Sequence, residues 1–120
     1  MIEQIQGLPN NILWFEATGT VTGEDYETVL IPAVEAKLKE YPKVRMIYQL
    51  GSGFSGYSME AMWDDTKIGL KHLRAWEKIA VVSDTDWIRS AVHIFGFAIS
   101  GHIQVFKNDE LVEAKRWVSE

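Results

Sequence analysis

Apolar and polar residues alternate near the start of the chain, which is the pattern of a β-strand with one buried face. In residues 12–21, Leu13 and Phe15 fall on one side of such a strand and Glu16 falls on the other. A shorter apolar segment at 2–6 precedes it, and turn-forming residues separate the two. This pattern predicts a β-hairpin.

Residues 22–41 change to helical periodicity, with apolar side chains three or four positions apart. Thr22 has the side chain of an N-cap, and Asp25 completes a variant of the capping box. Pro32 lacks a backbone donor, so we expect the helix to kink or restart there. Pro42 closes the segment.

Three further strands and three further helices are predicted by the same criteria. Strands are expected at 44–50, 79–82 and 102–106, helices at 58–73, 87–100 and 108–117, and a loop at 51–57. The order ββαβαβαβα is typical of an α/β fold with a mostly parallel sheet and right-handed crossovers.

Composition narrows the class of protein. The 120 residues are 47% hydrophobic and 24% charged, as in one soluble globular domain spanning residues 1–120. The net charge of -5 argues against nucleic acid as a partner. No apolar run is long enough for a membrane span, and no signal peptide is evident, so we expect a cytoplasmic protein. The absence of cysteine excludes disulfides and thiol catalysis.

Six short segments spread over nearly the whole chain share the pattern of one protein family. They are residues 26–32, 62–65, 69–72, 79–87, 105–106 and 114–117. Together they resemble the SpoIIAA-like (STAS-like) family of small bacterial proteins. The resemblance implies a βα superhelix of four turns, as in anti-sigma-factor antagonists. Those antagonists are phosphorylated on the serine of an Asp-Ser step at the start of their second helix. The corresponding segment here lacks that step, so Ser58 is expected to act only as a helix cap.

The glycine-rich segment from Gly51 to Gly56 matches G-x-G-x-x-G between a strand and a helix, where a dinucleotide motif would lie. The helix is expected to begin only after the third glycine, which favours an ordinary loop. A G-x-S-x-G nucleophile elbow is also incomplete, since Tyr57 replaces its last glycine. The candidate residues for a ligand or anion are Gly53, Ser55, Gly56, Tyr57 and Ser58.

The helix predicted at 87–100 is apolar on more than one side. Beside its core stripe, Trp87, Ile94 and Phe97 form a second apolar stripe. A helix that is apolar on most sides is covered on most sides. These three residues and Phe54 are therefore candidates for a subunit interface or an apolar pocket.

No combination of residues indicates a metal centre or a cofactor, and the histidines lack metal-ligand spacing. We expect a non-enzymatic regulatory or protein-interaction module whose partner is another protein or, as a homodimer, a second copy. The alternative is a carrier or sensor of a small apolar, lipid-like ligand. A nucleotide-binding domain is the third hypothesis.

Overall fold

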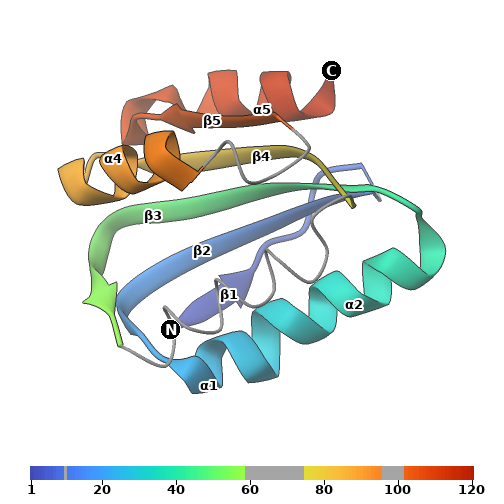
Figure 1. Cartoon of the computed structure of the whole chain (residues 1–120), viewed down its shortest axis with the longest axis horizontal. Helices are drawn as coiled ribbons and strands as arrows, with labels where there is room; N and C mark the ends of the chain where they lie inside the picture. The colour runs from blue at the N-terminus through green and yellow to red at the C-terminus, as the bar shows by residue number, and fades with distance from the viewer. Residues whose placement is uncertain (10, 59–74, 96–101) are drawn as a thin grey trace.

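A five-stranded sheet forms the centre of the protein (Figure 1). The computed structural model describes residues 1–9, 11–58, 75–95 and 102–120. The strands are β1 (Ile2–Gln4), β2 (Ile12–Val21), β3 (Val44–Tyr57), β4 (Trp76–Ser83) and β5 (His102–Phe106). They lie side by side in chain order, with β1 antiparallel to β2 and the other neighbours parallel. The predicted hairpin and the mostly parallel α/β sheet are confirmed.

Helices cover both faces of this sheet. The described helices are α1 (Gly23–Asp25), the π-helix η1 (Tyr26–Leu30), α2 (Ile31–Glu40), α4 (Asp86–Phe95), the 3-10 helix η3 (Asn108–Glu110) and α5 (Leu111–Ser119). Figure 1 shows α2 below the sheet and α5 above it. Ile88 of α4 belongs to the core cluster on the α2 side. Each crossover leads to the neighbouring strand, and crossovers of the same hand then place their helices on the same face of the sheet. This explains why α2 and α4 share one face.

The first helical segment begins at the predicted cap, and a new α-helix begins at Ile31, next to Pro32. The Thr22 Oγ1 accepts from the Asp25 N–H at 3.3 Å, and the Thr22 N–H donates to Asp25 Oδ2 at 2.8 Å. Pro32 cannot donate, and its ring would crowd the Thr28 carbonyl in a regular helix. The π-helical turn just before it relieves this conflict, since the Ile31 N–H reaches back to the Tyr26 carbonyl. The predicted restart at Pro32 is thereby explained.

Two apolar cores form, one on each face of the sheet. On the α2 face, Leu13, Phe15 and Val34 are completely buried. On the opposite face, α5 packs its Ala114 and Val118 against the sheet. Alternation along β2 predicted the first core correctly, because successive side chains of a strand point to opposite faces.

Basic side chains from the sheet hold the C-terminal end of α5. Arg45 Nη1 donates to the Val118 carbonyl and Lys78 Nζ to the Trp117 carbonyl, both at 2.9 Å. Helix C-termini present unpaired carbonyls and a partial negative charge, which cations stabilise. Lys115, in the same helix, lies 4.2 Å from the centre of the Trp14 ring. These contacts fix α5 across β3 and β4.

The predicted loop at 51–57 was wrong, because β3 continues to Tyr57. Beyond the last residue that pairs with β4, β3 keeps β2 as its neighbour, with Gly19 opposite Phe54 and Thr20 opposite Gly56. Register shifts around Gly19 accommodate the irregular pairing. A long partner strand therefore outweighs the low strand propensity of glycine and serine.

Other boundaries differ by a few residues. β1 ends at Gln4, not at residue 6, and β4 begins at Trp76, not at residue 79. The helix predicted at 58–73 and the end of the one predicted at 87–100 lie outside the described residues.

Candidate functional site

The candidate ligand residues lie on the last part of β3. Gly53 and Ser55 are exposed, whereas Phe54 is half-buried and packs against the core on the α2 face. Gly56 has a φ of 152°, a conformation that other residues rarely adopt. Ser58 follows the strand, and its N–H donates to the Val21 carbonyl at 2.8 Å. Tyr57 ends the strand, and its side chain lies outside the description.

This geometry differs from that of a dinucleotide loop or a nucleophile elbow. Both motifs place the glycines in a tight turn between a strand and a helix. Here the segment from Gly51 to Tyr57 is itself a strand that runs beside β2. The order of the described strands also never reverses, whereas nucleotides in doubly wound sheets bind where the order reverses. The expected role of Ser58 as a helix cap concerns residues outside the description.

The candidate apolar surface is described in part. Trp87, in the first turn of α4, is 48% exposed, whereas the adjacent Ile88 is 5% exposed and packs into the core. Ile94 belongs to α4, but its side chain is outside the description, as is the whole of Phe97. The structure thus places one of the four candidates, Trp87, on an open part of the surface.

Polar contacts fix the start of α4 beneath Trp87. The Ser83 Oγ accepts from the Thr85 N–H at 3.0 Å, and Arg89 Nη1 donates to the Ser83 carbonyl at 3.1 Å. Asp84 Oδ1 accepts from the Asn108 N–H at 3.0 Å, which joins this turn to η3. Asp84 therefore has a structural role at the start of α4.

The described residues contain neither a cluster suited to a metal ion nor a membrane-spanning helix. No group of three or more histidine, cysteine or acidic side chains is placed to hold a metal ion in the part of the chain that is described. Within the same residues, no helix is long and apolar enough to cross a membrane.

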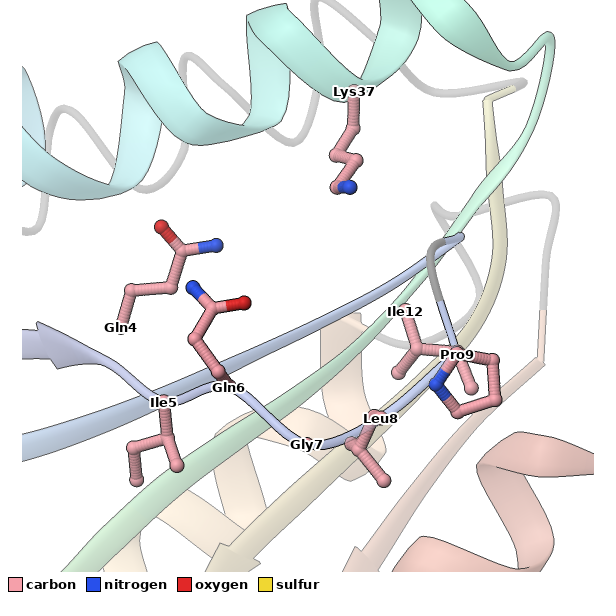
Figure 2. Close-up of a pocket in the computed structure, with 8 residues that line it drawn as sticks. All are labelled: Gln4, Ile5, Gln6, Gly7, Leu8, Pro9, Ile12 and Lys37. Carbon is pink, nitrogen blue, oxygen red and sulfur yellow. The ribbon is translucent and has the colours of Figure 1, made fainter.

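A small hollow that sequence reasoning missed lies between α2 and the segment that follows β1 (Figure 2). Its volume is about 30 Å³, room for one or two water molecules. The ends of the Gln4, Gln6 and Lys37 side chains point toward it. Lys37 is remote in sequence from the two glutamines, so no local motif could have indicated this cluster.

Comparison with known proteins defines the class and then the family. This chain is similar to a solved structure over 98% of its own length and 92% of the other chain, with a TM-score of 0.76 and 25% sequence identity. That protein is an uncharacterised protein from Shewanella loihica PV-4, from a family of unknown function, and has a SpoIIAA-like fold. The SpoIIAA-like family model matches residues 12–119, so the chain belongs to the SpoIIAA-like family. Among curated proteins, none matches.

Proposed function

We propose that this chain is a single-domain, non-enzymatic protein-interaction module that forms a homodimer through the surface around Trp87. The observation that supports it is the large exposed fraction of Trp87 on a helix whose next residue is buried. Tryptophan is enriched at the centres of protein interfaces, where burial of its ring contributes strongly to binding. In a twofold dimer the Trp87 of each subunit would lie in the interface, so one substitution would act twice.

The surroundings of Trp87 also suit an interface. Asp84 and Asp86 are exposed beside it, and polar side chains commonly surround the apolar centre of a contact. The start of α4 is held by Ser83 and Arg89, so Trp87 sits on a fixed support. A preorganised apolar side chain loses little conformational entropy on binding.

The alternative, a carrier of a small apolar ligand, would place Phe54, Tyr57, Trp87 and Phe97 around a cavity. Phe54 instead contributes to the core on the α2 face. The hollow beside Lys37 is far too small for an acyl chain. We therefore favour protein contact in a cytoplasmic setting over ligand transport.

Sedimentation velocity of the wild type and two charge-adding variants tests the proposal. Trp87→Glu should give a folded monomer, because a buried carboxylate in the interface is costly while an acid in the first helical turn is tolerated. Val112→Glu is the matched control, since Val112 is 64% exposed on α5, across the sheet from the α2 face. It should remain dimeric. Dissociation of both variants, or of neither, would contradict an interface at Trp87.

A further inference from the structure

We propose that the hollow between α2 and the segment after β1 binds a small oxyanion, a carboxylate or a phosphate group, through Lys37, Gln4 and Gln6. Figure 2 shows the polar ends of these three side chains directed toward one open space. They come from two separate parts of the chain, which only the tertiary fold brings together. This inference is independent of the interface at Trp87.

Lys37 supplies the positive charge. Its side chain is half-buried beneath α2, and within the described residues no hydrogen bond or ion pair engages its ammonium group. Two basic side chains that belong to the sheet, Arg45 and Lys78, instead donate to carbonyls of α5. A partly desolvated ammonium gains most from an acceptor that has a negative charge.

The two glutamines supply neutral donors on the same side. Ile2 belongs to the core on the α2 face, so alternation along β1 places Gln4 on that face and Glu3 on the other. Each glutamine amide has two N–H donors, and the lysine has three. Oxyanion oxygens accept several such bonds at once.

The shape of the hollow limits the ligand to a compact group. Gly7, with a φ of 118°, turns the chain around its edge, and a Cβ added there would meet no atom within 4 Å. Ile5 and Ile12 are fixed by backbone hydrogen bonds to Trp14 and Pro9, at 2.8 and 3.0 Å. Gln4, Gln6 and Gly7 at its rim are exposed, so a carboxylate or phosphate group can bind at the hollow with part of its surface in solvent, whereas a volume of about 30 Å³ cannot enclose a nucleotide.

The competing explanation is that Lys37 only complements the dipole at the C-terminal end of α2. Lys39 is in the same last turn and serves that role equally well, but it is exposed. A role for Lys37 at the helix dipole would also not explain why Gln4 and Gln6 point toward the same hollow. The two lysines therefore form a matched pair for an experiment.

The test is an NMR titration of the nitrogen-15-labelled full chain with sodium phosphate and, separately, sodium acetate, at ionic strength held constant with sodium chloride. We expect saturable shifts of the Gln4 and Gln6 side-chain amides and of the Gly7 amide. Lys37→Met should weaken binding by about tenfold or more, because it removes the charged donor. Lys37→Arg should keep most of the affinity, and Lys39→Met should leave it within about twofold.

Saturation by phosphate alone or acetate alone supports the site and assigns its ligand group. No saturable shift with either anion would overturn the proposal. Equal weakening by Lys37→Met and Lys39→Met would also overturn it, since that result indicates unspecific charge attraction. Circular dichroism of each variant shows that the fold is intact, and sedimentation should be unchanged.

Discussion

Removing the Arg45 side chain should loosen α5 from the sheet. Arg45 Nε donates to Glu77 Oε1 at 2.5 Å, while Nη1 donates to the Val118 carbonyl at 2.9 Å. The arginine side chain is 17% exposed and that of Glu77 40% exposed. Arg45→Met keeps an aliphatic side chain but removes both hydrogen bonds, leaving the end of α5 without one of its two cationic partners.

The expected loss of stability in Arg45→Met follows from how exposed these two side chains are. A hydrogen bond from a charged group contributes about 1.5–3 kcal/mol, and this one reaches a carbonyl of the helix terminus. The ion pair with Glu77 is more exposed to solvent, which screens it, so it contributes at most about 1 kcal/mol to the free energy of unfolding. We therefore expect Arg45→Met to lower the free energy of unfolding by about 2 kcal/mol, and Glu77→Gln by less than about 1 kcal/mol.

Urea unfolding followed by circular dichroism measures both values by linear extrapolation. In Arg45→Met, hydrogen exchange should accelerate more for the amides of α5 than for those of β2. The lost hydrogen bond holds only α5, so only α5 opens more often. Equal free energies for the two variants would refute the argument that the contact with Val118 dominates. Unchanged hydrogen exchange in α5 would refute the claim that Arg45 stabilises this helix.

Two further predictions concern β3 and the first helix. Gly56→Ala should lower the free energy of unfolding, measured in urea, by about 1–3 kcal/mol, because Gly56 has a φ of 152°. Gly53→Ala should change that free energy little, since a Cβ added at Gly53 meets Thr18 at ordinary contact distance. Equal effects would contradict this. Burial raises the pKa of Asp25, but hydrogen bonds from Thr22 and the Met1 ammonium charge outweigh it and lower that pKa overall. Asp25 therefore stabilises the fold above its unfolded pKa of about 3.9, and this contribution is lost as the pH falls through the lower folded value. Asp25→Ala should cost about 1 kcal/mol near neutral pH and progressively less in acid; a cost independent of pH would be inconsistent with this mechanism.

Local patterns predicted most of the described fold. Alternation along 12–21 identified the buried face of β2, and Thr22 marked the start of the first helix, because both signals are confined to a few neighbouring residues. The extension of β3 was missed for the opposite reason. Its glycines and serines have the composition of a turn, and only the long parallel partner β2 makes that segment a strand.

The candidate site shows the same division. Helical spacing was enough to place Trp87 off the core stripe, and its large exposed fraction agrees with that placement. The convergence of Lys37 with Gln4 and Gln6 arises because the fold places α2 beside the segment that follows β1, which no periodicity reports. The contacts of Arg45 and Lys78 with α5 likewise join residues that are far apart in sequence.

Native mass spectrometry of the purified wild-type chain tests the proposed interaction module most directly, because one spectrum separates a dimer from a monomer with a retained ligand. We predict a dimer of twice the chain mass without added mass, in equilibrium with a monomer as the protein is diluted. A species that stays monomeric at high micromolar concentration would contradict the homodimer. A monomer that retains a lipid or nucleotide mass would contradict it in favour of a ligand-binding function.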